Sequence, residues 1–139
     1  MRSIQPDVFL VDPDGSCRLV GGYCGSSGRH HFPFQDCCPY SGATDVERVE
    51  LTDRATLWGW TTVTAAPPGY SGPVPYGFGV VELAGGTGAG LRVITRITVG
   101  EQASGDLDFG MPMRLLPEVV ATGDDGEPVV AWAFAPVQR

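Results

Sequence analysis

Five runs of β-branched and aromatic residues, each bounded by glycine, proline or aspartate turn signals, most constrain the fold of this chain. They span residues 55–65, 78–84, 91–99, 111–121 and 129–135. Their short length and composition are typical of β-strands. With 20 glycines and 12 prolines, the chain has few long stretches of good helix formers, so helix should be scarce. The glycine-rich stretch 85–90 and the turn around Gly126 should make hairpins of adjacent runs.

Five short strands without intervening helices predict a small closed barrel, and the OB-fold is the common barrel of this size. We therefore expect a mostly β protein with an OB-fold domain over residues 46–139. Residues 1–18 show little periodicity and contain Pro6, Pro13 and an Asp14-Gly15 turn signal, which predicts an irregular leader. Between the leader and the OB-fold domain, residues 19–45 are rich in glycine, serine, cysteine and aromatic residues, and we treat them as a separate segment.

The charge balance excludes some classes of partner. Nine basic residues against 16 acidic ones give a formal net charge of -7, which repels phosphate backbones, so nucleic acid is not an expected partner. No run of about 18 apolar residues is present, and the N-terminal stretch lacks the pattern of a signal peptide. We expect a cytoplasmic protein without a membrane segment, whose four cysteines stay thiols or bind metal.

The segment 19–45 carries half of a zinc-binding pattern. Cys24 and Cys38 stand at the first positions of two C-x-x-C pairs, but Ser27 and Ser41 occupy the second positions. Structural zinc sites supply cysteine or histidine at all four corners. The other potential ligands, namely Cys17, Cys37, His30 and His31, do not lie at the required spacing. The pattern predicts a degenerate site at Cys24 and Cys38, where zinc is possible but not expected, and no other cofactor.

No set of residues in the sequence predicts catalysis. The two histidines lie beside Cys37 and Cys38, and a thiolate activated by histidine is chemically sound, but a local cluster of these residues more often reflects a metal site or its remnant. The carboxylates are scattered among turns and strand ends. We therefore assign no catalytic residue.

Aromatic residues are the candidates for an interface, because tryptophan, tyrosine and phenylalanine are favoured anchors in protein contacts. Alternation along residues 55–65 places Trp58 and Trp60 on the same face of the strand. The full set of candidates is Phe32, Phe34, Tyr40, Trp58, Trp60, Tyr76 and Phe78.

Six motifs follow one another between Leu19 and Pro136, namely "LVGGYCGSSG", "HFPFQDCCPYSG", "ATLWGWTTVT", "YGFGVVELAGG", "FGMPMRLLPE" and "VVAWAFAPV". In this order they resemble the DUF35 family of acyl-CoA-associated OB-fold proteins. The first two are similar to the halves of its rubredoxin-like zinc ribbon, and the other four resemble segments of its barrel. Ser27, Ser41, Phe34 and Gln35 depart from the family pattern. We expect the ribbon to persist without metal, with Phe32, Phe34 and Tyr40 forming a small apolar knot in place of the ion.

The resemblance implies a non-catalytic accessory subunit that binds a thiolase-like or ketoacyl-synthase-like protein in a hetero-oligomer. Acyl-CoA or another acyl thioester would then be bound by the partner, for acyl transfer, thiolysis or retro-aldol cleavage. The alternative is a free-standing OB-fold module that binds an acyl-CoA-like ligand itself, with Arg92, Arg96 and Arg114 as the candidates for its nucleotide end. Binding of single-stranded nucleic acid is a third reading, which the charge disfavours.

Overall fold

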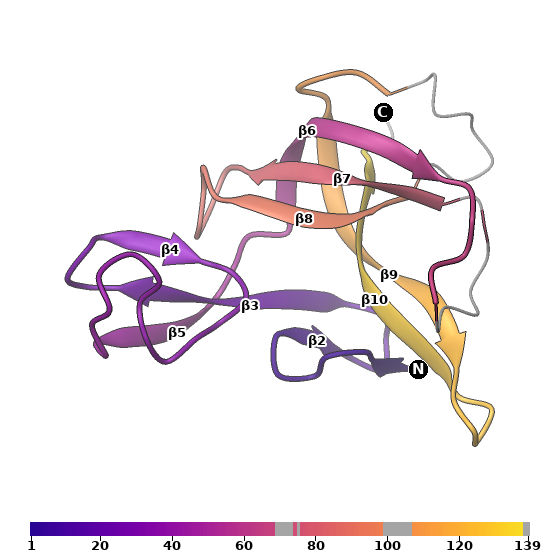
Figure 1. Ribbon diagram of the computed structural model, residues 1–139, viewed down its shortest axis with the longest axis horizontal. Coiled ribbons are helices and arrows are strands. Elements are labelled where there is room, and N and C mark those ends of the chain that lie inside the picture. Colours follow the sequence, from indigo (N-terminus) through magenta and orange to yellow (C-terminus); the bar gives the residue numbers. More distant parts are fainter. Residues whose placement is uncertain (69–73, 75, 99–106, 138–139) are drawn as a thin grey trace.

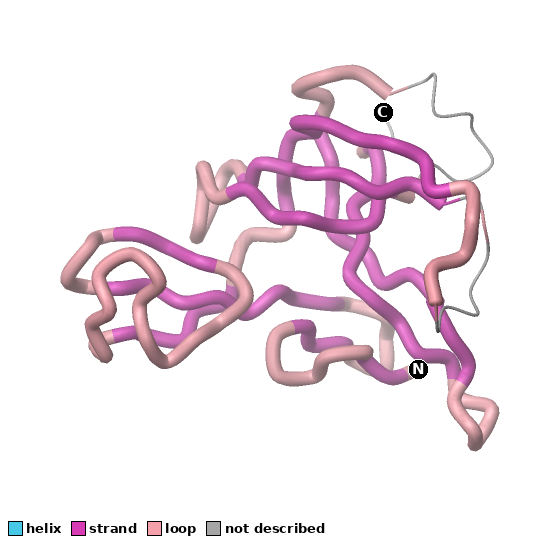
Figure 2. The backbone as a smooth tube through the Cα atoms, viewed as in Figure 1, coloured by secondary structure: helices cyan, strands magenta, loops and turns pink. Residues whose placement is uncertain are grey.

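The computed structural model describes residues 1–68, 74, 76–98 and 107–137, and in these ranges the chain consists of strands and loops (Figure 2). Within them, no helix has the length and apolar character needed to span a membrane. The strands in chain order are β1 (Arg2–Ser3), β2 (Phe9–Val11), β3 (Cys17–Cys24), β4 (Arg29–His31), β5 (Val46–Glu50), β6 (Arg54–Val63), β7 (Tyr76–Leu83), β8 (Arg92–Ile97), β9 (Pro112–Thr122) and β10 (Pro128–Pro136).

Strands β6 to β10 are the five predicted strands, and they close into a barrel (Figure 1). Neighbours follow the order β10-β8-β7-β6-β9, and β9 pairs with β10 to complete the ring. All of these pairings are antiparallel except that of β8 with β10, in which Ala133 lies opposite Arg96. Closure removes the exposed sheet edges that an open five-stranded sheet would leave. The expected closed barrel of the OB-fold type is confirmed.

A smaller sheet is built around β3, which is long enough to pair with different strands along its length. Its first half pairs with β2, and its second half pairs with β4 on one side and β5 on the other (Figure 1). The leader that we expected to be irregular thus contributes β2 to this sheet, and β1 pairs in parallel with β10. Strand β5, expected in the barrel domain, belongs to the smaller sheet.

The two sheets share one hydrophobic core. Phe9 and Leu19 of the smaller sheet are fully buried in the same cluster as Val81 and Phe134 of the barrel. The remaining members of the cluster are Leu51, Ala55, Leu57, Leu83, Val93, Ile97, Leu107, Met113, Leu115 and Val130. Because the core is continuous, the start of β3 is held to the barrel by packing.

A β-bulge in β6 overturns the expectation that Trp58 and Trp60 share a face. Leu57 lies opposite Val81 and Gly59 lies opposite Val80, so Trp58 is an extra residue in the ladder. The extra residue reverses the alternation beyond it. Trp58 is therefore exposed on the outer surface, whereas Trp60 packs against the core.

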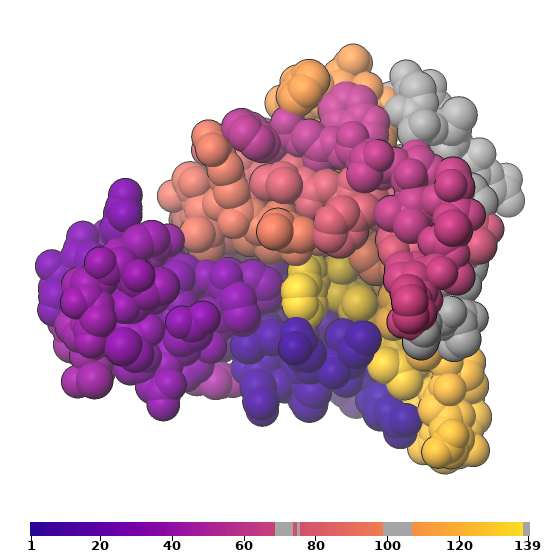
Figure 3. Space-filling model, viewed as in Figure 1, coloured from indigo at the N-terminus to yellow at the C-terminus, as the bar shows by residue number. Residues whose placement is uncertain are grey.

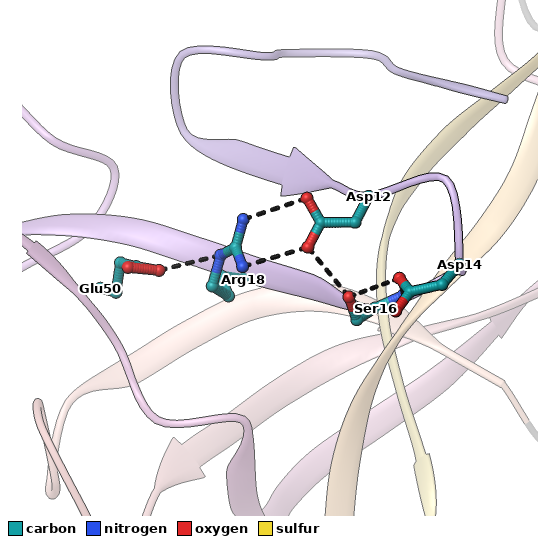
Figure 4. Close-up of polar contacts among 5 residues, drawn as sticks. All are labelled: Asp12, Asp14, Ser16, Arg18 and Glu50. Atoms are coloured by element: carbon teal, nitrogen blue, oxygen red, sulfur yellow. Dashed lines mark hydrogen bonds and ion pairs between the residues drawn. The ribbon is translucent and has the colours of Figure 1, made fainter.

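Arg18 holds the smaller sheet together on its polar side (Figure 4). From β3, its guanidinium contacts both carboxylate oxygens of Asp12, at 3.1 and 3.3 Å, and Oε1 of Glu50 on β5 at 2.8 Å. The turn between β2 and β3 is closed by Asp14, which accepts hydrogen bonds from the hydroxyl and the backbone N–H of Ser16. These hydrogen bonds lower the pKa of Asp14 below its ordinary value.

Candidate functional site

An apolar groove of about 600 Å³ lies where the barrel, the smaller sheet and the N-terminal segment meet. In Figure 3 it corresponds to the region where yellow atoms of the C-terminal strand lie between the barrel above, the indigo N-terminal residues below and the purple segment on the left. Its lining residues are Ile4, Gln5, Phe32, Pro33, Phe78, Arg92, Val93, Ile94, Thr95, Arg96, Ala131 and Trp132. The volume is within the range of small-molecule sites, and the apolar lining also suits a protein side chain.

Alternation along β8 explains the composition of the groove. Val93 and Ile97 point into the core, so the intervening Ile94 points outward and is 63% exposed. Trp132 of β10 donates a hydrogen bond from its indole Nε1 to the carbonyl oxygen of Ile94, over 3.0 Å. The same indole meets the ring of Phe32 edge-on, with centroids 5.3 Å apart. A polar contact and a ring contact thus fix the position of Trp132 between the barrel and the smaller sheet.

The arginines at the groove already have acidic and aromatic partners. Arg92 lies over the ring of Trp58 at 4.1 Å and pairs with Glu82 at 3.9 Å. Arg96 lies over the ring of Tyr76 at 4.1 Å and forms a charge-assisted hydrogen bond with Glu118. A phosphate group would have to compete with these carboxylates. The groove therefore presents an apolar surface with neutralised charges at its edge.

The structure brings some of the predicted interface residues together and separates others. Phe32 and Phe78 line the groove. Trp58 and Tyr76 lie beneath the two arginines at its edge, and Trp60 packs against Phe109 with centroids 5.3 Å apart.

Sequence reasoning missed Ile4, Ile94 and Trp132. The outward position of Ile94 follows from alternation in "LRVITRITV", so that signal was present. The places of Ile4 and Trp132 depend on contacts between distant segments, and no local pattern predicts them.

Two matching turns lie at the far end of the smaller sheet. In the first, Gly28 donates its N–H to the carbonyl oxygen of Cys24 over 2.8 Å, and in the second Gly42 donates to Cys38 over the same distance. Both glycines have positive φ, of 69° and 75°. A glycine in this left-handed conformation lets the chain reverse tightly after each Cys-x-x-Ser unit.

Cys24 and Cys38, the predicted degenerate metal positions, converge between these turns with Ser27 and Ser41, and each sulfur lies within hydrogen-bond reach of a serine hydroxyl. Cys24 Sγ lies 3.6 Å from Ser41 Oγ, and Ser27 Oγ lies 3.7 Å from Cys38 Sγ. Cys24 also donates to Oδ1 of Asp45 over 3.5 Å. Two hydroxyls complete the set, and a neutral hydroxyl is a poor ligand for structural zinc. Among the described residues no group of three or more histidine, cysteine, aspartate or glutamate side chains is arranged to hold a metal ion, so these residues do not fit a zinc site.

The turn environment stabilises the thiolate form of Cys38. Burial raises its pKa, but hydrogen bonds from the side chains of Ser41 and Cys24, and from the backbone N–H groups of Ser41 and Tyr40, outweigh burial and lower the pKa to about 6. Asp45 accepts a hydrogen bond from the Ser26 hydroxyl at 2.7 Å, which, with the bond from Cys24, holds its pKa below the ordinary value. A hydrogen-bonded network thus occupies the place of the ion.

The aromatic side chains do not form the apolar knot that we expected. Phe32 is drawn into the groove and contacts Trp132. Phe34 lies under the guanidinium of Arg48, at 5.3 Å from its ring centroid. Tyr40 is half exposed and lies under Arg29 at 4.6 Å. The expected knot is wrong because each ring finds a separate partner and the thiol–hydroxyl network fills the space between the turns.

The histidines and the neighbouring cysteines have different partners. His31 is buried, and its Nε2 accepts a hydrogen bond from the backbone N–H of Gln35 over 3.2 Å. His30 stacks on Tyr23 with centroids 4.9 Å apart. Cys37 is exposed and donates its thiol hydrogen to the carbonyl oxygen of Gly42 over 3.3 Å. His31 thus closes the loop that carries Phe32 and Pro33, because its side chain bonds to the backbone at the far end of that loop.

Comparison with known proteins gives consistent relatives for this architecture. A family model described as ChsH2, C-terminal OB-fold domain, matches residues 48–116. A DUF35 domain-containing scaffold protein of Pyrococcus furiosus is 26% identical over 121 residues, which cover 86% of this chain and 84% of the relative. A scaffold protein of the same description from Methanocaldococcus jannaschii is 25% identical over 123 residues, covering 87% and 83%. Among solved structures, one described as an Ltp2-ChsH2(DUF35) aldolase shares the fold, with a TM-score of 0.59 and 24% identity over 86% of this chain and 84% of that one.

Proposed function

The chain belongs to the DUF35 family, and from this membership we propose that it is a non-catalytic scaffold subunit that docks on a thiolase-fold enzyme acting on acyl thioesters. The observation that carries the proposal is the apolar groove beside Ile94 and Trp132, because an exposed apolar surface of this kind marks interaction sites in soluble proteins. The enzyme partner, its thiolase fold and its acyl substrate are parts of the proposal.

The relatives support a role in an assembly. Two of them are described as scaffold proteins, and the solved structure that shares the fold is described as an aldolase of Ltp2 with ChsH2(DUF35). In this reading the partner supplies the catalytic residues for acyl transfer, thiolysis or retro-aldol cleavage. The described residues of this chain supply the groove, whose lining combines aromatic and aliphatic side chains. Such side chains are typical of the centre of a protein interface.

Co-purification tests the proposal directly. The tagged protein is recovered from its native cell lysate, retained proteins are identified by mass spectrometry, and zinc is measured in the same eluate. A thiolase-fold protein retained in stoichiometric amount is the expected result. Retention of no such protein would contradict the scaffold role.

A pair of variants tests the docking surface against the identified partner. Ile94→Arg places a charge in the groove and should weaken binding at least tenfold, on the order of a hot-spot residue. Val119→Arg is the matched control, because Val119 is also an exposed aliphatic residue but does not line the groove. Equal binding by both variants, with unchanged thermal unfolding, would rule out the groove as the docking site.

The alternative of a free-standing module makes a different prediction. If the groove binds acyl-CoA without a partner, calorimetric titration of the isolated chain with short acyl-CoAs should give a saturable signal that Ile94→Arg removes. The volume of the groove suits an acyl chain. The pairing of Arg92 and Arg96 with carboxylates favours the scaffold reading, because it leaves these two nucleotide-end candidates engaged.

A further inference from the structure

Two arginines lie directly opposite each other on the outer face of the barrel. The start of β6 pairs with the start of β9 (Figure 1), and the register places Arg54 against Arg114. Their neighbours Ala55 and Met113 are buried in the core, so both arginine side chains point outward, and both are exposed. Opposite residues of an antiparallel pair have Cβ atoms about 4.5–5.5 Å apart, and like charges in such a pair destabilise the sheet.

The strands on either side bring no counter-charge to this pair. The carbonyl oxygen of Arg54 accepts a hydrogen bond from the backbone N–H of Ala84 over 3.0 Å, and Arg114 lies opposite Ala135 of β10. Asp53 Oδ1 lies 3.8 Å from Arg54 Nε, but the two side chains are 65% and 64% exposed, and an exposed ion pair contributes little. Among the described residues, no carboxylate forms an ion pair with Arg114. Within this part of the chain the repulsion is therefore not offset.

An aromatic side chain extends the same face. Thr56 and Trp58 follow Arg54 along β6 at intervals of two residues, up to the bulge, so they also point away from the core. Trp58 is 48% exposed, and the guanidinium of Arg92 lies over its ring at 4.1 Å. Tryptophan and arginine are among the residues most enriched at the energetic centres of protein interfaces. Small ligands usually need a concave site, so an open sheet face with these side chains is better suited to a protein.

We infer that the face formed by Arg54, Arg114 and Trp58 binds an acidic segment of a partner protein. Carboxylates placed between the two guanidinium groups would remove their repulsion and accept charge-assisted hydrogen bonds from both. The complementarity is local, because the chain as a whole carries a net charge of -7 and repels a long polyanion such as nucleic acid. These three residues do not line the apolar groove, so the face is a second surface that does not depend on the proposed scaffold role.

Titration with short peptides tests the inference on the isolated chain. The isotope-labelled protein is titrated with pentaglutamate at low ionic strength, and its backbone amides are followed by NMR, with pentaglutamine and pentalysine as neutral and basic controls. Saturable shifts at residues 54–58 and 112–116 are expected with pentaglutamate alone, and added salt should weaken them. Arg114→Glu should weaken binding about tenfold or more, because it removes a donor and repels the peptide. The same variant should raise the unfolding temperature by about 1–4 °C, because the new carboxylate faces Arg54. A variant that gains stability and loses binding has not lost it through misfolding.

Arg29→Glu is the matched control. Arg29 is also exposed, and its replacement changes the net charge equally, but it lies on β4 of the smaller sheet. Equal weakening by Arg29→Glu and Arg114→Glu would overturn the inference, because binding would then follow net charge alone. The absence of a saturable response to pentaglutamate, shifts confined to other strands, or a stronger response to short single-stranded DNA would overturn it too. If Arg114→Glu does not fold, Arg114→Gln removes the charge without reversing it and should still weaken binding.

Discussion

Placing cysteines at the two serine positions between the paired turns should complete a set of four zinc ligands. The change is the double substitution of Ser27→Cys and Ser41→Cys. The distances of 3.6 Å from Cys24 to Ser41 and 3.7 Å from Ser27 to Cys38 are two opposite edges of the four-residue cluster. A tetrahedron of thiolates with Zn–S bonds of about 2.3 Å has edges of about 3.8 Å. These two of the six edges are therefore already close to the spacing that zinc requires.

The magnitude follows from linkage between binding and folding. A ligand that binds the folded state alone stabilises it by about 2.7 kcal/mol when its free concentration is 100 times its dissociation constant. For a domain of this size, that free energy raises the unfolding temperature by roughly 10 °C. The double variant should retain one zinc per chain through gel filtration, and a strong chelator should remove this gain in unfolding temperature.

The unchanged protein is the control, since its two hydroxyls should leave zinc unbound under the same conditions. Each single substitution should bind more weakly than the double one, because three thiolates and a hydroxyl form an incomplete set. Metal content by mass spectrometry and thermal unfolding with and without chelator are sufficient measurements. If the double variant folds but retains no zinc, the argument that the turns preserve the geometry of a metal site is refuted.

Two further predictions concern ionisable groups. Folding lowers the pKa of Cys38 from its ordinary value of 9.0 to about 6, so its contribution to stability is complete above about pH 9 and is lost as the pH falls towards 6. The free energy of unfolding in urea should therefore rise with pH across this range, and Cys38→Ser should reduce that rise. An identical pH dependence in the variant would contradict the assignment. Glu118→Gln should lower the free energy of unfolding by about 2–3 kcal/mol, because it breaks a mostly buried ion pair with Arg96. Glu82→Gln, at the exposed ion pair with Arg92, should lower it by less than about 1 kcal/mol. Equal losses of both variants in denaturant titrations would refute that difference.

The barrel was largely predictable because its strands are marked by local signals. Each of the five runs is bounded by turn residues, and the observed ends of β6 to β10 lie within two residues of the predicted ones. The hairpin turn at Gly126 was predictable for the same reason, since this glycine adopts a φ of 80°. Pairing of strands that are neighbours in sequence gives β6-β7-β8 and β9-β10, and the barrel closes through the β6–β9 and β8–β10 pairings.

The features that were not predictable depend on pairing between distant segments. "VERVE" in β5 does not alternate, since Val46 and Val49 are three residues apart, and only the packing of the whole chain assigns it to β3. The bulge at Trp58 adds one residue to the ladder without a local signal, and it reverses which side chains face the core beyond it. The candidate site was predicted in part, since Phe32 and Phe78 line the groove, but the contribution of Ile4 depends on how the N-terminal segment lies against the barrel.

The pairing of β1 with β10 sets an order for folding during synthesis. The amino group of Met1 bonds to Glu127, 126 residues later in the chain, and Arg2 pairs with Asp125. On the ribosome, β1 must therefore wait unpaired until β10 has emerged. Phe9 waits as well, because its ring contact with Trp132 comes from the same late strand. A chain that stops before β10 would lack the strand that pairs with β1 and the ring that contacts Phe9, so it should leave the N-terminal segment open to proteases.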